Sequence, residues 1–105
     1  MSLPPQPCNF VQLRATLAER GSLRFSPGGV ALLSATLRHT SQQMQAGAQR
    51  TIELEVAAVF AGRLAERAER VSLGASIFAS GFLAPRRKAS RLMLLNVTEF
   101  ELIEV

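Results

Sequence analysis

Residues 51–71 read TIELEVAAVFAGRLAERAERV, and the spacing of their apolar residues changes partway along. In residues 51–59 apolar and polar residues alternate, which predicts a strand. Its inward side chains would be Ile52, Leu54 and Val56. In residues 60–70 the apolar residues follow a helical spacing instead. They are Phe60, Leu64, Ala68 and, just beyond, Val71. We therefore expect a strand that runs directly into one short helix.

A hairpin is expected before this strand. The sequence Ser26-Pro27-Gly28-Gly29 is typical of a turn, because Pro fixes φ and Gly tolerates a positive φ. The turn joins residues 23–25 to a strand over residues 31–40. The inward residues of that strand would be Leu33, Ala35 and Leu37. Residues 41–50 (SQQMQAGAQR) are polar and lack acids, which predicts a long loop.

The first ordered segment, residues 9–20, fits two structures. Val11, Leu13, Ala15 and Leu17 alternate as in a strand. Phe10, Leu13 and Leu17 also share one helical face, and the Ala, Leu, Arg and Glu content favours a helix. Local propensity leaves both structures open for this segment.

Two further strands are expected after the helix. Residues 72–84 are rich in small side chains, and Gly81 indicates a bend or a bulge. Residues 92–105 form the last strand, and its inward phase shifts between Val97 and Phe100, which also indicates a bulge. The resulting order of elements is typical of an OB-fold, a mainly β, five-stranded, partly open barrel. Its one short helix lies between strands three and four. We expect this domain over residues 9–105, after a flexible, Pro-rich lead at residues 1–8.

The excess positive charge of the chain lies in one short loop. Residues 85–91 read PRRKASR and hold four of the 12 basic residues, so the remaining eight balance the 8 acids. The loop connects strands four and five, which in an OB-fold borders the nucleic-acid face. A basic loop on a neutral body predicts a contact to a phosphate backbone, and the alternative is a solvated turn.

Composition indicates a soluble domain of the cytoplasm. With 105 residues the chain makes one domain, small enough for a partner subunit to help its stability. Cys8 is the only cysteine, which excludes an internal disulfide and a paired-cysteine metal site and favours a reducing compartment. No signal peptide is recognisable, and no segment approaches the roughly 18 apolar residues of a membrane span. We expect no membrane association.

Five short motifs then follow one another along nearly the whole chain, from about Asn9 to Glu104. They are residues 24–30 (RFSPGGV), residues 37–41 (LRHTS) before the Ala-Gly segment, residues 80–83 (SGFL), the basic loop, and residues 100–104 (FELIE). In this order they resemble the primosomal replication protein N family (primosomal protein B), a relative of bacterial single-stranded-DNA-binding protein. The resemblance favours a strand for residues 9–20.

The resemblance implies an OB-fold homodimer that binds single-stranded DNA and assists the restart of stalled replication forks. Its implied partners are the primosomal helicase, the single-stranded-DNA-binding protein and the helicase-loading primosomal protein. It also implies no catalytic activity and no cofactor. Residues 9–40 are expected to supply much of the dimer interface.

The contacts to nucleic acid are expected to be ionic. The predicted residues are Arg24, Arg50, Arg86, Arg87, Lys88 and Arg91. Arg38 could add a further contact, or it could equally pair with Glu53 or Glu55 across the sheet. Aromatic residues for base stacking are scarce, because the chain has no Trp or Tyr and residues 49–53, near which relatives can carry an aromatic, have none. Of the six Phe, Phe60, Phe82 and Phe100 are interpreted as structural. The stacking candidates are Phe25 and Phe78.

An enzyme is not expected, and two other binding functions stay open. His39, the only histidine, is interpreted as a hydrogen-bonded strand residue, and Cys8 has no basic neighbour to activate it. The basic loop could instead dock an acidic protein surface, which would make the chain a protein-interaction module. The same fold also serves RNA, so an RNA-binding OB domain is the other alternative.

Overall fold

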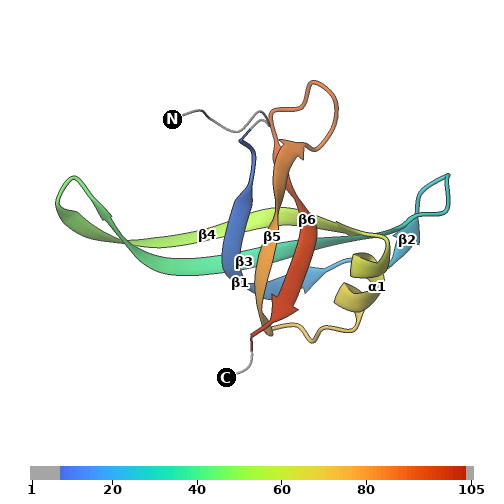
Figure 1. Ribbon diagram of the computed structural model, residues 1–105, viewed down its shortest axis with the longest axis horizontal. Coiled ribbons are helices and arrows are strands. Elements are labelled where there is room, and N and C mark those ends of the chain that lie inside the picture. Colours follow the sequence, from blue (N-terminus) through green and yellow to red (C-terminus); the bar gives the residue numbers. More distant parts are fainter. Residues whose placement is uncertain (1–7, 104–105) are drawn as a thin grey trace, which may run out of the picture.

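A computed structural model describes residues 8–103 of the protein and shows one barrel with a single helix (Figure 1). In chain order its elements are β1 (Val11–Arg20), β2 (Arg24–Phe25), β3 (Ala31–Gln45), β4 (Ala48–Ala61), α1 (Arg63–Glu69), β5 (Ser76–Pro85) and β6 (Met93–Leu102). The strands form one sheet in the order β1-β5-β6-β4-β3-β2, and a further pairing of β1 with β3 closes the five long strands into a barrel. The OB-fold prediction is confirmed. Of the predicted lead, residues 1–7 lie outside the described residues.

β1 is a strand, as the family resemblance implied, and its two halves pair with different neighbours. Residues Val11 to Thr16 pair with β5, whereas residues Thr16 to Arg20 pair with β3. A register shift between Leu17 and Glu19 accompanies the change of partner. Tertiary pairing therefore decides a segment whose local propensity was ambiguous.

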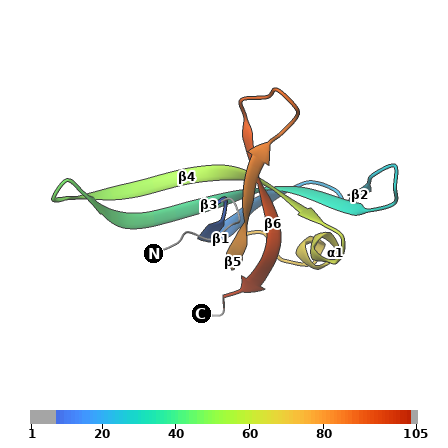
Figure 2. The same ribbon diagram turned by 45° about the horizontal axis from the view of Figure 1, so that its top comes forward.

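Inward apolar side chains of every long strand fill the barrel. The largest fully buried ones are Leu17, Leu33, Leu37, Phe60, Ile77 and Leu95. Phe60 and Phe100 pack edge to face with their ring centroids 5.3 Å apart, which confirms that both are core residues. α1 covers one end of the barrel with Ala65 and Ala68, which are fully buried (Figure 2).

The helix is shorter than predicted, and Phe60 belongs to the preceding strand. β4 continues to Ala61, because its inward alternation of Val56, Ala58 and Phe60 carries on into the core. Gly62 then adopts a positive φ of 67°, which ends the strand and begins the helix at Arg63. The sequence pattern misled because Phe60 fits both a strand period and a helical period.

Residues 41–50 are not a loop but the outer end of a long β3–β4 hairpin. β3 and β4 pair without interruption from Leu32 with Ala61 to Gln45 with Ala48. Only Ala46 and Gly47 turn, and both have positive φ, as in the two-residue turns that suit the twist of a hairpin. Polar side chains on both faces made this stretch look like a loop. Cross-strand hydrogen bonds such as Gln42 Nε2 to Thr51 Oγ1 (2.9 Å) join the two strands there.

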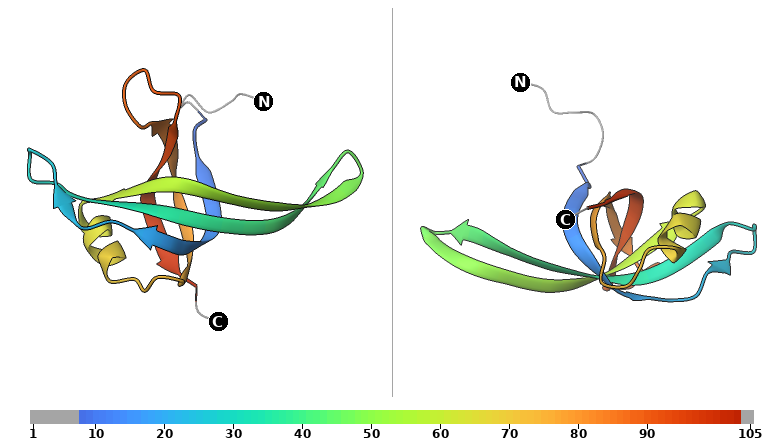
Figure 3. Two further views of the ribbon diagram at one scale, coloured as in Figure 1. Left: turned by 180° about the vertical axis from the view of Figure 1, so that it is seen from behind. Right: turned by 90° about the horizontal axis from the view of Figure 1, so that it is seen from below.

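The outer half of this hairpin extends beyond the barrel, on the opposite side from the turn at residues 26–30 (Figure 3). The radius of gyration is 15.3 Å, more than the roughly 13 Å of a compact domain of this length. Ile52 and Leu54, which were predicted to face inward, are therefore not in the core, and Leu54 is 40% exposed. Val56, nearer the barrel, does pack against the core.

The turn at residues 26–29 and the bulge at Gly81 are confirmed, but the strand predicted over residues 72–84 begins only at Ser76, after a turn. β2 pairs with the start of β3, and the Ser26 side chain accepts a hydrogen bond from Val30 N (3.1 Å) within the turn. The register between β5 and β6 shifts next to Gly81, where Thr98 is left without a partner in the ladder. The irregularity expected at Gly81 and the bulge expected between Val97 and Phe100 are therefore the same bulge. In the part of the chain that is described, no helix has the length and apolarity needed to cross a membrane.

Candidate nucleic-acid interface

The basic loop lies between β5 and β6 at the end of the barrel away from α1 (Figure 1). Hydrogen bonds within the loop give it a defined shape: Arg86 N donates to Leu92 O (2.9 Å), Ser90 N to Arg87 O (2.9 Å) and Leu92 N to Ser90 Oγ (3.0 Å). Its four basic side chains are exposed. Within residues 8–103 the single ion pair joins Arg38 to Glu55, so the loop cations have no acidic partner there.

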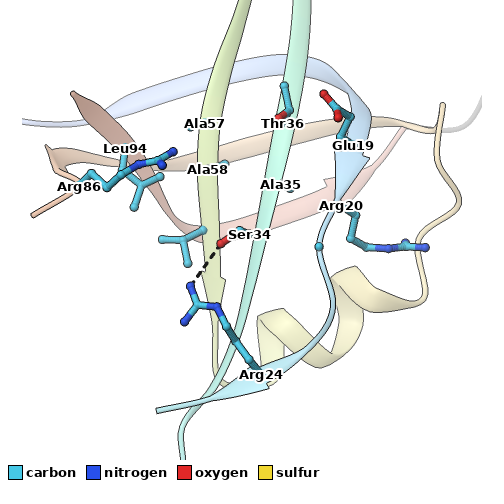
Figure 4. Close-up of a pocket in the computed structure, with 12 residues that line it drawn as sticks. Glu19, Arg20, Arg24, Ser34, Ala35, Thr36, Ala57, Ala58, Arg86 and Leu94 are labelled. Carbon is cyan, nitrogen blue, oxygen red and sulfur yellow. Dashed lines mark hydrogen bonds between the residues drawn. The ribbon is translucent and has the colours of Figure 1, made fainter. Parts of the chain in front are cut away.

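A groove with a cavity volume of about 500 Å³ lies between this loop and the end of β1. Arg86 lines it from the loop side and Arg24 lines it from β2. Figure 4 shows the Arg24 side chain pointing toward Ser34, to whose Oγ its Nη2 donates a hydrogen bond of 3.3 Å. Two cations that are 62 positions apart in sequence (86 − 24) therefore border one surface.

The floor of the groove is the outward face of β3 and β4. Ser34 is the register partner of Val59, and Thr36 is the register partner of Ala57. These four side chains are uncharged and line the groove, together with Leu94 of β6. No aromatic side chain belongs to the lining. The floor can thus accept an extended chain, but it offers no platform on which a base would stack.

Two charged residues at the far side of the groove have other roles. The guanidinium of Arg20 donates to the carbonyls of Ala68 and Val71, just where α1 ends, and so is committed to the helix (Figure 4). Glu19 is the one acid among the lining residues. The free positive charge of the groove therefore comes from Arg24 and Arg86.

The other predicted basic residues lie outside this groove. Arg87 and Lys88 line a shallow hollow on the loop itself, and Arg91 is exposed beside it. Arg50 lies near the tip of the β3–β4 hairpin, where its Nη1 donates to Gln45 Oε1. Arg50 is therefore separated from the groove by the outer half of the hairpin (Figure 3).

The stacking candidates lie on different surfaces. Phe25 is 64% exposed and follows Arg24 on β2. Phe78 is 37% exposed on the outward face of β5, between its register partners Arg14 and Glu101, and it does not line the groove. Phe82 was interpreted as structural but is 41% exposed. The sequence did not reveal the exposure of Phe82, because its position after Gly81 does not show that its side chain lies on the solvent-facing side of β5.

His39, the one histidine of the sequence, has a structural role. His39 Nδ1 must donate to the carbonyl of Arg14 (2.7 Å), so in the neutral ring Nε2 accepts from the Ser41 hydroxyl (2.8 Å). This confirms the hydrogen-bonded strand histidine. Cys8 is exposed. The described residues contain no group of three or more His, Cys, Asp or Glu that could hold a metal ion.

The sequence patterns did not predict which residues form the groove floor, nor that Arg24 and Arg86 border the same groove. Ser34 and Thr36 were recognisable only as outward residues of a strand, by their alternation with Leu33, Ala35 and Leu37. No sequence signal could place Ala57 and Val59 beside them, because that depends on the pairing register of β3 and β4.

Comparison with known proteins gives consistent matches. Residues 9–99 match the model of a family described as "Another single-strand binding protein family". A replication restart protein PriB from Nitrosomonas europaea is 32% identical over 95 residues, which cover 90% of this chain and 88% of that protein. The replication restart protein PriB of Bordetella pertussis is 36% identical over 91 residues, covering 87% of this chain and 85% of that protein.

Solved structures show the same fold. The structure of PriB from Ralstonia solanacearum superposes with a TM-score of 0.86 at 31% identity, covering 93% of this chain and all (100%) of that one. The single-stranded DNA binding protein from Thermus aquaticus gives a TM-score of 0.73 at 25% identity, covering 91% of this chain and 50% of that one.

Proposed function

Because the chain belongs to the replication restart protein PriB family, within the single-strand binding proteins, we propose that it binds single-stranded DNA in the groove between Arg24 and Arg86. The membership agrees with the family resemblance seen in the sequence motifs. The family names describe binding and restart proteins, in agreement with the expectation that the chain is not an enzyme.

The observation that carries the proposal is that two arginines without an acidic partner among the described residues, Arg24 and Arg86, border a groove with an uncharged floor. Arginine binds phosphate oxygens with two parallel hydrogen bonds, so two arginines across a groove can hold two phosphates of one strand. The floor of Ser34, Thr36, Ala57 and Val59 leaves room for sugars and bases without reading them. The binding would therefore be independent of sequence.

Phosphate contacts would supply most of the affinity. Stacking contributes about 1–3 kcal/mol per base in proteins that have aromatic platforms, and this groove has none. Arg87, Lys88 and Arg91 of the loop would extend the track of contacts beyond the groove. Arg50 would reach only a strand that continues to the hairpin tip, and Phe25 and Phe78 would stack only bases that leave the groove.

The test is a titration of labelled single-stranded and duplex oligonucleotides of equal length at several salt concentrations. Each phosphate neutralised on a single strand changes the slope of log K against log salt by about −0.7. We expect Arg24→Ala and Arg86→Ala each to weaken single-strand binding about fivefold near 0.1 M salt, with a slope shallower by about 0.7. Arg63→Ala of α1 removes the same charge away from the groove and serves as the control. Equal binding of duplex, or groove variants that behave like Arg63→Ala, would contradict the proposal.

A second copy of the chain would complete the open edge of β1. Val11 to Ala15 pair with β5 on one side, and no other described strand pairs with them, since the pairing with β3 begins at Thr16. A free strand edge is a template for another chain. His39 Nδ1 of β3 bonds Arg14 O at this edge, and Leu54 of β4, which is 40% exposed, is the register partner of His39. A homodimer that pairs these edges should dissociate in a Leu54→Glu variant, which sedimentation equilibrium measures.

We also propose a role in replication restart, which the names of the relatives support, and with it a location in the cytoplasm beside the chromosome. The proposed partners are the primosomal helicase, the single-stranded-DNA-binding protein and the helicase-loading primosomal protein. Unwinding of a forked substrate by the primosomal helicase should be faster when the chain is present. If loop variants lose this stimulation but keep DNA affinity, the loop docks an acidic protein surface instead. If RNA competes as well as DNA, the chain is a general single-strand binder.

A further inference from the structure

The outward face of the β3–β4 hairpin continues from the groove toward the tip, and its charge changes along the way. Beyond the uncharged floor, the next outward pair is Arg38 opposite Glu55, and the one after it is Thr40 opposite Glu53. These four residues line a second surface hollow, which we call the distal face. With one cation and two acids, the distal face has a net negative charge.

The one cation of the distal face is already occupied. Arg38 Nε (3.2 Å) and Nη2 (2.8 Å) both donate to Oε2 of Glu55. The side chains of Arg38 and Glu55 are 60% and 51% exposed, so water reaches the pair. An exposed pair of this kind contributes little to stability, about 0–1 kcal/mol, and can be opened at small cost. Its main effect is on what Arg38 can bind.

Glu53 adds a second negative charge beside this pair. It faces outward two residues before Glu55 on the same strand face, and it is exposed. Among the described residues Glu53 has no ion-pair partner. A phosphate that moved from the groove floor toward the hairpin tip would therefore meet two carboxylates and a neutralised arginine.

We propose that Glu55 masks Arg38 as a phosphate contact and that Glu53 and Glu55 together end the DNA path at the outer edge of the groove. The inference rests on the proposed function, since it describes how far the strand extends along that same surface. Arg38 is then a latent contact, which a phosphate can use only when Glu55 releases it. The acids limit the length of DNA that one subunit covers and separate the groove from Arg50.

The test compares Glu55→Gln, Glu53→Gln and Arg38→Ala with Glu101→Gln, which removes the same charge on β6 beyond the groove. Glu55→Gln frees Arg38, so the salt slope should steepen by about 0.7 and affinity near 0.1 M salt should rise about fivefold. Glu53→Gln should raise affinity less, because it adds no contact. Both should lengthen the shortest oligonucleotide that binds fully, whereas Arg38→Ala should bind within about twofold of the wild type.

The double variant Arg38→Ala with Glu55→Gln separates masking from simple repulsion, because the gain in salt slope should disappear when Arg38 is absent. A salt slope, an affinity and an oligonucleotide length that do not respond to Glu55→Gln would overturn the inference. So would a loss of affinity in Arg38→Ala as large as in Arg86→Ala, because Arg38 would then already contact DNA. If the wild type binds no single-stranded DNA, or Arg24→Ala and Arg86→Ala have no effect, the proposed function itself fails. Circular dichroism of each variant checks that the fold is kept.

Discussion

Gly81 of β5 lies so close to Asn96 of β6 that a Cβ atom on Gly81 would lie 2.0 Å from the carbonyl oxygen of Asn96. The same Cβ would lie 2.8 Å from the carbonyl carbon of Asn96, so the obstacle is backbone rather than a side chain that can turn away. This close approach occurs at the bulge where the ladder between β5 and β6 shifts register. The two strands that carry the basic loop therefore approach each other closely at a residue without a side chain.

The first prediction concerns this contact. Gly81→Ala should lower the free energy of unfolding by at least about 2 kcal/mol, because β5 and β6 must separate to admit a methyl group. Gly28→Ala is the matched control, since its Cβ would meet Ser26 Oγ at 3.9 Å, an ordinary contact. Urea denaturation of both variants gives the comparison. Equal stability of the two would show that the bulge can relax.

The second prediction concerns the link between β1 and α1. Arg20→Ala removes a donor from the carbonyl of Ala68, in the last turn of a short helix, and from that of Val71, just beyond the helix. The loss should cost about 1–3 kcal/mol, the range for hydrogen bonds to a charged group. Arg63→Ala at the start of the same helix should cost little, since a positive charge is unfavourable there. Thermal unfolding of the two variants measures the difference.

The third prediction concerns the loop as a whole. Changing Arg86, Arg87 and Lys88 together to Ala should make the slope of log K against log salt shallower by about 2, at about 0.7 per phosphate. If all four loop cations engage DNA, the loop alone supplies a slope of roughly −3 in the wild type. Titrations between low and high salt measure both slopes. An unchanged slope in the triple variant would exclude the loop as a phosphate contact.

The fourth prediction concerns Phe25. It is the exposed aromatic residue that follows a groove arginine, so a base that leaves the groove beside Arg24 can stack on it. Phe25→Leu should weaken single-strand binding by about 1 kcal/mol, the lower end of the stacking range, with no change in salt slope. Phe82→Leu, also an exposed phenylalanine, is the control. A salt slope that changes with Phe25→Leu would mean that the variant disturbs Arg24 instead.

Local patterns predicted most of the fold, and they failed where one pattern has two readings. Phe60 satisfies the period of a strand and that of a helix, and only Gly62 with its positive φ decides between them. Residues 41–50 are polar on both faces, so composition alone could not distinguish a solvent-exposed hairpin from a loop. In both places the pairing partner, not the segment itself, determines the structure.

The candidate site could be predicted only in part, because the positions of its residues relative to one another depend on how the strands pair to close the barrel. The loop charges are visible in the sequence as a cluster. Arg24 was predicted as an ionic contact, but its position across a groove from Arg86 follows from the sheet order. The opposition of Arg38 to Glu55 was one of two pairings that the alternation allowed, and the register of β3 with β4 selects it.

The two-residue turn at Ala46 and Gly47 also bears on the order in which the molecule folds. The whole β3–β4 ladder is local to this turn and can close pair by pair from it, whereas the pairing of Val11 with Gly81 must bring together residues 70 positions apart (81 − 11). Closing a loop of that length costs entropy before any contact repays it. Changes at the turn should therefore slow folding, while changes in β1 should mainly speed unfolding. We therefore expect the hairpin that projects from the finished barrel to form first, and β1 and β6 to pair afterwards with its two strands.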